Sequence, residues 1–186
     1  MKAKAAKIKV YLIGRMSRDP RDKQWREDIT PFLEKLNFKI YNPYLLEPMQ
    51  LKGLKPGRLP DKAPDGTKIT HWYELSAFPQ DSSEYKRFMK YMQSIIDFDL
   101  NIVENVADIM IARWSDSCTS GGGSAAEVSL ARKLRKPVYL VNEAKKVPEW
   151  VQGCVTRMFS SFEELHKFLT EEYGEQDADL SEELIN

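Results

Sequence analysis

The sequence predicts an α/β fold in which a parallel sheet of about five strands lies between two layers of helices. Short apolar runs rich in β-forming residues alternate with helical patterns along the chain, and this alternation is typical of a parallel sheet. The 186 residues, 42% of them hydrophobic, are enough for one well-buried core. We therefore expect a single domain over residues 1–173, with an inserted loop at 45–80, followed by an acidic, disordered tail at 174–186.

The first part of the chain predicts two strands and two helices. In order, the expected elements are a strand at 7–13, a helix at 22–37, a strand at 38–42, the inserted loop at 45–80 and a long helix at 81–106. Gly14 and Pro43 end the two strands, and Pro31 is expected to kink or restart the first helix. The inserted loop is too long for a plain connection, and such loops are usually functional or disordered.

The second part predicts three more strands. The expected elements are strands at 107–113, 137–141 and 155–159 and helices at 124–135 and 161–173. Ser161 and Glu164 have the spacing of a capping box at the start of the last helix. With the flavodoxin-like strand order 2-1-3-4-5, the loops after the first and third strands face each other beyond the carboxyl edge of the sheet. We therefore expect Gly14–Asp19 to lie against Ser115–Glu127.

The most informative stretch is the segment from Thr119 to Glu127, which contains three consecutive glycines. Such glycines let the backbone approach an anionic or sugar ligand, and the amides of the following helix point at that ligand. Glu127 is expected in the first turn, where the helix dipole favours a charged carboxylate and suits a nucleophile. Ser124 and Glu127 also fit a capping box, and the two roles are compatible.

Composition and charge exclude several functions. The formal net charge is zero, so no global field favours nucleic acid or a membrane surface. No apolar run has the length of a membrane span, and no signal peptide is visible. Cys118 and Cys154 are expected to be reduced thiols of a cytoplasmic protein. His71 and His166 are far apart in the sequence and no zinc motif is present, so we expect neither a metal nor a cofactor.

Asp99 is a carboxylate within an apolar stripe of the long helix. The stripe consists of Met92, Ile96, Asp99, Val103 and Val106, whereas Asp97, Asn101 and Glu104 form a solvated face. Burying a carboxylate is costly unless it is protonated, paired or hydrogen-bonded. Asp99 is therefore interpreted as an acid or a ligand-binding group. In the alternative interpretation, Asp99 lies at the edge of the stripe and bonds local backbone.

Several motifs together resemble the nucleoside 2-deoxyribosyltransferase family, which includes the 2'-deoxynucleoside 5'-phosphate N-hydrolases. The matching segments are Val10–Gly14, Trp25–Glu27, Asp99–Val103, Ala107–Met110, Gly121–Ala131 and Lys136–Val138. The resemblance implies a flavodoxin-like fold and glycosyl chemistry. Glu127 matches the nucleophile that attacks C1', Tyr11 the tyrosine that orients this carboxylate, and Asp99 the aspartate that helps protonate the leaving base. This division of roles between two carboxylates is that of retaining glycosidases.

One position departs from the family pattern. Transferases of the family often carry an aspartate six residues before the nucleophile, where it contacts the 5' hydroxyl of the sugar, and this chain has Gly121 there. The change removes a repulsion against a 5' phosphate, and residues after the first strand resemble the phosphate-binding residues of the hydrolases. The sequence thus favours a nucleotide over a free nucleoside. The expected substrate-binding residues are Gly14, Arg15, Met16, Ser17, Arg18, Trp114, Gly121, Gly122, Gly123 and Ser124.

These residues also have plainer interpretations. Arg15 and Arg18 are equally explained as surface charges near Asp19 and Asp22. Trp114, just past the third strand, is expected to stack on the base. The bases and aromatics of the inserted loop, including His71-Trp72-Tyr73, suit either a phosphate clamp or a solvated loop with one aromatic anchor.

Two other functions compete with glycosyl transfer. Ribonucleotide phosphoribohydrolases of the lysine-decarboxylase-like type have a similar loop, but usually with a proline and a threonine that this chain lacks. A nucleotide-binding sensor without turnover would share the same pocket. We further expect a nucleoside or nucleotide and an acceptor base as small-molecule partners. A homo-oligomer is expected because a second apolar stripe on the long helix contains Tyr91, Ile95, Phe98 and Ile102.

Overall fold

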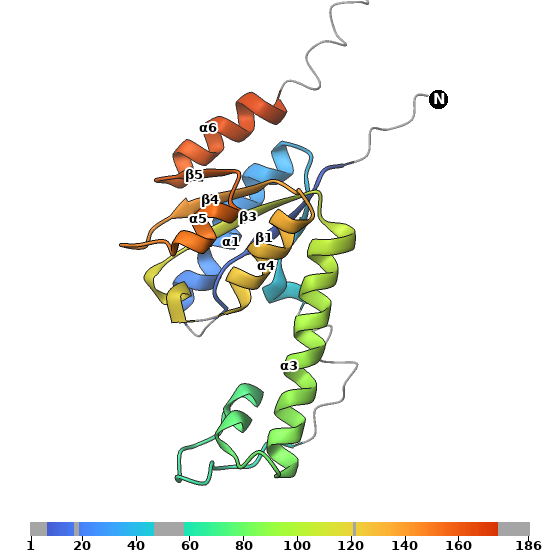
Figure 1. The fold of residues 1–186 in the computed structure, drawn as a ribbon, viewed down its shortest axis with the longest axis vertical. Helices are drawn as coiled ribbons and strands as arrows, with labels where there is room; N and C mark the ends of the chain where they lie inside the picture. Colours follow the sequence, from blue (N-terminus) through green and yellow to red (C-terminus); the bar gives the residue numbers. More distant parts are fainter. Residues whose placement is uncertain (1–6, 17–18, 47–57, 121, 175–186) are drawn as a thin grey trace, which may run out of the picture. The chain divides into compact units, whose positions relative to one another are not determined.

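The structure is a computed structural model, and it describes residues 7–16, 19–46, 58–120 and 122–174. The chain divides into two compact units (Figure 1). One unit consists of Met1–Asn42 and Ile102–Asn186, and the other is Pro43–Asn101. The expected tail lies outside the described residues except for Gly174, as do positions 47–57 of the insertion.

The first unit contains a five-stranded parallel sheet. Its strands are β1 (Lys9–Ile13), β2 (Lys39–Tyr41), β3 (Ile109–Trp114), β4 (Val138–Asn142) and β5 (Arg157–Phe159). They are ordered β2-β1-β3-β4-β5, and every neighbouring pair is parallel. This confirms the fold class and the strand order that the sequence predicts.

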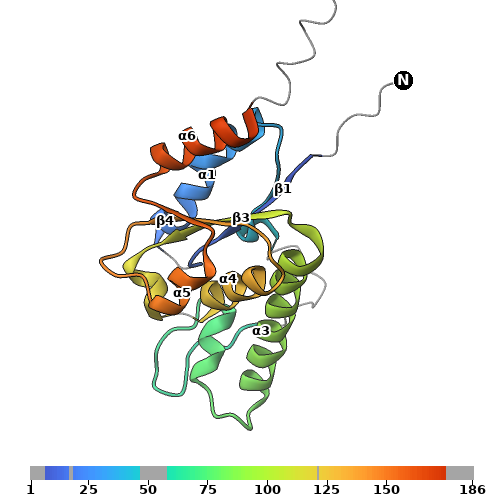
Figure 2. The same ribbon diagram turned by 45° about the horizontal axis from the view of Figure 1, so that its top comes forward.

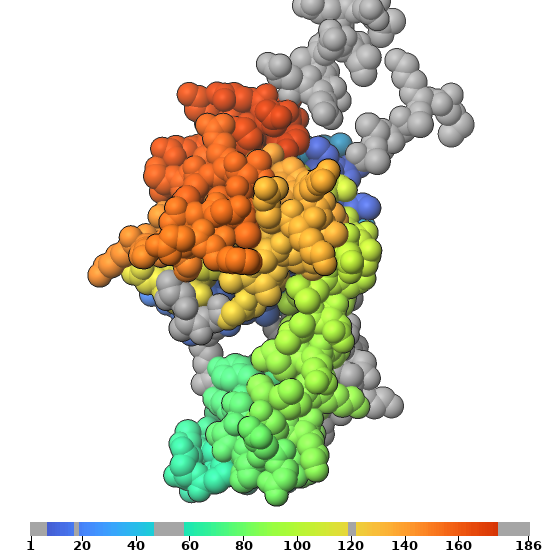
Figure 3. Space-filling view, viewed as in Figure 1, coloured from blue at the N-terminus to red at the C-terminus, as the bar shows by residue number. Residues whose placement is uncertain are grey.

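Helices cover both faces of this sheet. Helices α1 (Pro20–Lys35) and α6 (Phe162–Tyr173) lie on one face, and α4 (Gly123–Lys133) and α5 (Glu149–Cys154) lie on the other (Figure 2). The sequence did not predict α5. In the space-filling view α4 and α5 are adjacent at the surface (Figure 3). The expected break at Pro31 is absent, because α1 runs through this exposed residue as one helix.

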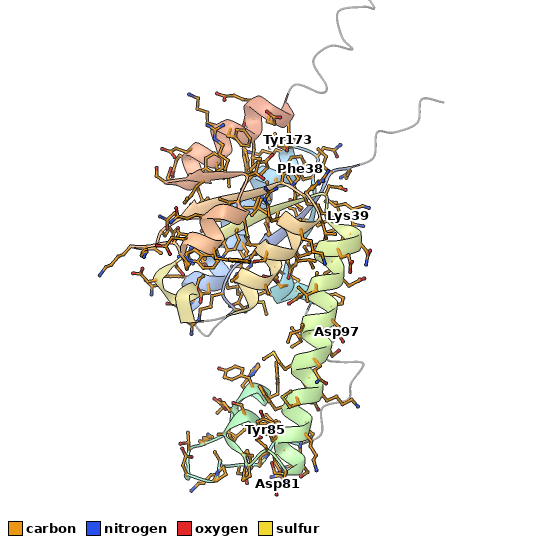
Figure 4. The ribbon with its side chains drawn as sticks, viewed as in Figure 1. Phe38, Lys39, Asp81, Tyr85, Asp97 and Tyr173 are labelled. Atoms are coloured by element: carbon orange, nitrogen blue, oxygen red, sulfur yellow. The ribbon has the colours of Figure 1, made fainter. Side chains whose placement is uncertain are left out.

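The core between the sheet and the α1–α6 layer is apolar and aromatic. Val10 and Leu12 of β1 point into it, together with Ile29 and Leu33 of α1. At one end of this core, the rings of Phe38 and Tyr173 meet edge to face at 5.4 Å (Figure 4). Side chains alternate along a strand, so Tyr11 points to the opposite face, toward α4.

The start of α6 is defined by local contacts that the sequence predicts. The Ser161 hydroxyl accepts a hydrogen bond from the Glu164 amide at 3.3 Å, and the Glu164 carboxylate accepts one from the Ser160 amide at 2.9 Å. The expected cap of the last helix is therefore confirmed.

The second unit consists of helix α3 (Ser83–Asn101) and part of the segment expected as a loop. This part contains an isolated bridge between Lys62 and Lys68 and a 3₁₀ helix, η1 (Trp72–Ala77). Trp72 contacts the rings of Phe88 and Tyr91 of α3. Asp81 and Tyr85 lie at the start of α3 (Figure 4). The described part of the insertion is thus packed against α3 through an aromatic cluster.

The long helix ends earlier than expected. From Ile102 to Val106 the backbone forms a π-helical turn, η2, in which the Ala107 amide donates to the Ile102 carbonyl at 2.8 Å. The Lys136 ammonium donates to the carbonyls of Val103, Glu104 and Ala107, each at 2.8 Å. Lys136 therefore closes this turn, and burial lowers the pKa of its ammonium group. Among the described residues, no helix is long and apolar enough to cross a membrane.

Candidate functional site

The centre of the site is a hydrogen bond between the strand β1 and the helix α4. The Tyr11 hydroxyl donates to Oε1 of Glu127 at 2.8 Å. Tyr11 is fully buried and Glu127 is 9% exposed. Glu127 lies on the side of α4 that also buries Val128 and Ala131 against the sheet. The contact that the family resemblance implies between these two residues is therefore present, and it fixes the orientation of the carboxylate.

The start of α4 differs from the expectation. The helix begins at Gly123, with Gly122 as its N-cap, and no side chain caps it. Glu127 is consequently the fifth residue of the helix and lies in the second turn. The predicted capping box between Ser124 and Glu127 is wrong for this reason. The argument from the helix dipole also fails, since this effect is confined to the first turn.

Neither backbone conformation nor close packing explains the glycines at the start of α4. Gly122 has φ −80° and ψ −21°, a conformation that any residue adopts. A Cβ atom added at Gly122 or at Gly123 would meet nothing within 4 Å. Both residues are exposed, and Ser124 beside them is half-buried. Open space therefore surrounds the amino end of α4, where backbone amides favour an anion. Gly121 lies outside the described residues.

The loops after β1 and β3 contact each other as expected. Nη1 of Arg15 donates to the carbonyl of Ser117 at 2.6 Å. Ser117 belongs to a 3₁₀ turn, η3 (Asp116–Ser120), which connects β3 to the glycine segment. Met16, next to Arg15, is half-buried, and the predicted binding residues Ser17 and Arg18 lie outside the described residues. The strand order thus brings these two loops to one edge of the first unit.

Gly14 is a glycine because the backbone there is closely packed. A Cβ atom on Gly14 would lie 3.1 Å from Cζ2 of Trp25 and 3.3 Å from Nη2 of Arg26. It would also lie 3.3 Å from the carbonyl oxygen of Arg113. The first residue of the loop after β1 therefore packs tightly against side chains of α1.

The sequence interpretation did not predict the partly buried ion pairs of Arg113. The Arg113 guanidinium bonds Glu143 at 2.6 Å and Asp22 at 3.4 Å. Arg26 is fully buried, and Asp22 is 4% exposed. The available signal was the spacing of Asp22, Trp25, Arg26 and Ile29, which places two charged residues on the buried stripe of α1.

The environments of two predicted site residues, Trp114 and Asp99, differ from the expectation. Trp114 is 1% exposed, so neither face of its ring is available to a base, and this contradicts the predicted stacking role. Asp99 lies in the last turn of α3, in the second unit, and is half-buried rather than enclosed. Its suggested role as an acid therefore rests on the family resemblance rather than on the cost of burial. The polar face of Asp97, Asn101 and Glu104 is exposed, as predicted.

Comparisons with known proteins give the fold. No family model matches the sequence, and no curated protein matches it. A solved structure of a conserved protein from Enterococcus faecalis V583 has a TM-score of 0.50 at 15% identity, over 90% of this chain and 99% of that one. The 2-deoxyribosyltransferase of Bacillus psychrosaccharolyticus has a TM-score of 0.49 at 13% identity, over 85% and 90% of the two chains. The fold is shared.

A cavity and two cysteines lie elsewhere in the described part of the chain. No group of three or more His, Cys, Asp and Glu residues in these ranges is arranged to hold a metal ion. Cys118 is buried and Cys154 is half-buried, and both are free thiols. A cavity of about 410 Å³ lies between α1 and α6, on the face of the sheet opposite Glu127, and Trp25, Arg113 and His166 are among its lining residues. The proposed function is therefore built on the Tyr11–Glu127 pair.

Proposed function

We propose that this protein is an enzyme that cleaves or transfers the N-glycosidic bond of a 2'-deoxynucleoside or its 5'-monophosphate, with Glu127 as the nucleophile. The observation that carries the proposal is the 2.8 Å hydrogen bond from Tyr11 to the largely buried Glu127. A largely buried carboxylate that the Tyr11 hydroxyl keeps in one orientation is suited to attack on a bound sugar. The family resemblance of the sequence assigns the same two residues to this step.

In the first step, an oxygen of the Glu127 carboxylate attacks C1' as the bond from C1' to the base nitrogen breaks. The products are a glycosyl ester on Glu127 and a base that takes up a proton. The Tyr11 hydroxyl keeps the attacking group in one orientation, so that little reorganisation is needed in the transition state. The backbone of Tyr11 is anchored within the sheet by the pairing of β1 with β2 and β3.

We assign proton donation to Asp99, following the family resemblance. The proton passes from its carboxyl group to the base nitrogen that leaves C1'. In the second step, water or an acceptor base gives a proton to the Asp99 carboxylate and attacks C1' on the opposite face, and Glu127 leaves as a carboxylate. Two displacements give net retention at C1'. Attack by water makes the protein a hydrolase, and attack by a second base makes it a transferase.

A 5' phosphate suits the described surroundings of the site better than a bare hydroxyl. Gly122 and Gly123 leave space at the amino end of α4, an eleven-residue helix whose N-terminal amides attract an anion. Arg15 lies on the loop that contacts η3, directly before this helix. In the sequence, Gly121 supplies no carboxylate to oppose the phosphate.

We also propose that the protein acts in the cytoplasm as a homo-oligomer, without a cofactor. Ile96 of α3 is 46% exposed, and a second copy of the chain would cover it. In the described part of the inserted segment, Trp72 packs on Tyr91, which is 4% exposed, while Ile96 stays exposed. Light scattering at micromolar concentration tests this point, and a monomer mass contradicts it.

The decisive assay measures release of free base from deoxynucleosides and their monophosphates, with and without an acceptor base. Base release from 2'-deoxy substrates supports the proposal, and the acceptor arm separates transferase from hydrolase. Equal or faster release from ribonucleotides would instead identify a phosphoribohydrolase. Tight binding of a nucleotide without any base release would identify a sensor, and would overturn the proposed activity.

A further inference from the structure

Arg26 is the most deeply buried charged residue in the described part of the chain, with no exposed surface. Burying a guanidinium is costly unless hydrogen bonds replace its water. Arg26 lies on α1, where its plane stacks on the ring of Trp25 at 4.5 Å. The family resemblance covers Trp25-Arg26-Glu27 as a motif but gives Arg26 no task. A fully buried arginine therefore needs an explanation from its contacts.

Those contacts join the end of β1 to the start of α1. Nη2 of Arg26 donates to the carbonyl of Gly14 at 2.8 Å and to that of Leu12 at 3.5 Å. Nη1 donates to the carbonyl of Arg15 at 3.4 Å and to that of Asp22, one turn earlier on α1. One guanidinium thus holds the carbonyls of Gly14 and Arg15, which are consecutive in the loop that follows the strand of Tyr11.

The loop is fitted to this guanidinium at close range. Nη2 would lie only 3.3 Å from a Cβ on Gly14, so a side chain at this position would crowd Arg26 where the backbone passes over it. From the other side, the Arg15 guanidinium bonds the Ser117 carbonyl at 2.6 Å. Arg15 is consequently held at both ends, its carbonyl by Arg26 and its side chain by the loop after β3.

We infer that Arg26 is a positioning residue for the 5' end of the substrate, acting through the backbone of Gly14 and Arg15. The inference rests on the proposed function, because it assumes that the loop after β1 meets the 5' phosphate. Arg26 itself touches no substrate. Its planar fork sets where the Arg15 side chain begins, and thereby how well this loop fits a phosphate at the amino end of α4.

A lysine at position 26 keeps the charge but loses the fork. An ammonium is a point donor on a flexible stem, and it does not reproduce the spread of the four carbonyl contacts. We expect Arg26→Lys to raise KM for a deoxynucleoside 5'-monophosphate at least about tenfold, with kcat changed less than about threefold. KM for the free deoxynucleoside should stay within about threefold, since that substrate has no phosphate to misplace.

Two further variants make the test specific. Ile29→Val removes one methyl group from the same buried stripe of α1, one turn beyond Arg26, and should leave both KM values unchanged. Gly14→Ala disturbs the same contact from the loop side, through the 3.1 Å approach to Trp25, and should reproduce the selective rise in KM. Gly14→Ala therefore keeps the inference testable if Arg26→Lys does not fold.

Hydrogen exchange separates this inference from the proposed activity. Amides of residues 12–16 should exchange faster in Arg26→Lys than in the natural protein and in Ile29→Val, whatever the enzyme does. If the natural protein releases no base, the proposed function fails. The hydrogen-exchange rates then still show whether Arg26 orders the loop. Two results for Arg26→Lys would overturn the inference. One is faster exchange with an equal rise in KM for the monophosphate and for the free nucleoside, and the other is no change in exchange or in either KM.

Discussion

The hydroxyl of Tyr11 and the carboxylate of Glu127 lie 116 positions apart in the sequence and are joined by a buried hydrogen bond of 2.8 Å. The strand β1 supplies the donor and the helix α4 the acceptor. Glu127 is in the second turn of α4, so its orientation comes from this contact and from packing rather than from the helix terminus. In the proposed mechanism, the orientation of the nucleophile therefore depends on the Tyr11 hydroxyl.

Removing the hydroxyl should slow the reaction while the ring keeps its place in the core. A hydrogen bond to a charged group contributes about 1.5–3 kcal/mol, so we expect Tyr11→Phe to lower kcat by about 10- to 150-fold. The base-release assay measures this. Tyr139→Phe is a matched control, because the hydroxyl of Tyr139 bonds that of Tyr173 at 2.8 Å in the α1–α6 layer. Full kcat in Tyr11→Phe contradicts the orienting role.

Asp99→Asn removes the proposed proton donor and preserves the shape of the side chain. General acid catalysis typically contributes a factor of about 10² to 10⁴, and we expect a loss of kcat in that range with a small change in KM. Asp97→Asn changes an exposed carboxylate of the same helix and should leave kcat unaltered. Equal kcat in the two variants would place Asp99 among the structural residues of α3.

The phosphate preference is tested by comparing kcat/KM for a monophosphate and its nucleoside. One charge-assisted contact of about 1.5–3 kcal/mol should favour the monophosphate by about 10-fold or more. Arg15→Ala should remove much of this preference, and high salt should weaken it. Arg132→Ala, at the exposed far end of α4, is the control and should keep it. A nucleoside that reacts as well as its monophosphate refutes a phosphate site.

His166 should make the stability of the fold depend on pH. Burial lowers the pKa of this imidazole, which stacks on Phe32 at 4.0 Å. The folded pKa lies below the unfolded value of about 6.5, so the unfolded state binds the proton more readily. The contribution to stability is therefore present above about pH 6.5 and is lost as the pH falls toward the folded pKa.

Thermal melting between pH 5 and pH 7.5 measures this effect. The Tm of the natural protein should fall over the acidic part of that range, and the fall should be smaller in His166→Gln, which has no titrating group at this position. An identical pH dependence of Tm in the two proteins would show that other groups set it.

The sequence predicted the sheet order and the facing of two loops, because apolar periodicity locates strands and the order of strands fixes which loops meet. It did not predict the start of α4. The S-x-x-E spacing of Ser124 and Glu127 suggested a cap, whereas the helix begins at Gly123 and Glu127 turns toward Tyr11. Tertiary contacts overrode the local signal.

The remaining errors share this cause. The π turn after α3 depends on the ammonium of Lys136, which is remote in sequence from the carbonyls it bonds. The burial of Trp114 depends on the layers around β3. Arg26 was overlooked because an arginine on a helix usually faces solvent, and only the loop that closes over it makes it buried.

The central claim is that Glu127 forms a covalent bond to the sugar, and Glu127→Gln tests it most directly. Glutamine keeps an oxygen that accepts from Tyr11, so the melting temperature should change little, while the amide is a poor nucleophile. We expect base release to fall at least about 10³-fold. Mass spectrometry of the quenched natural enzyme should place a deoxyribosyl adduct on Glu127. Turnover near that of the natural protein in Glu127→Gln would contradict the covalent mechanism.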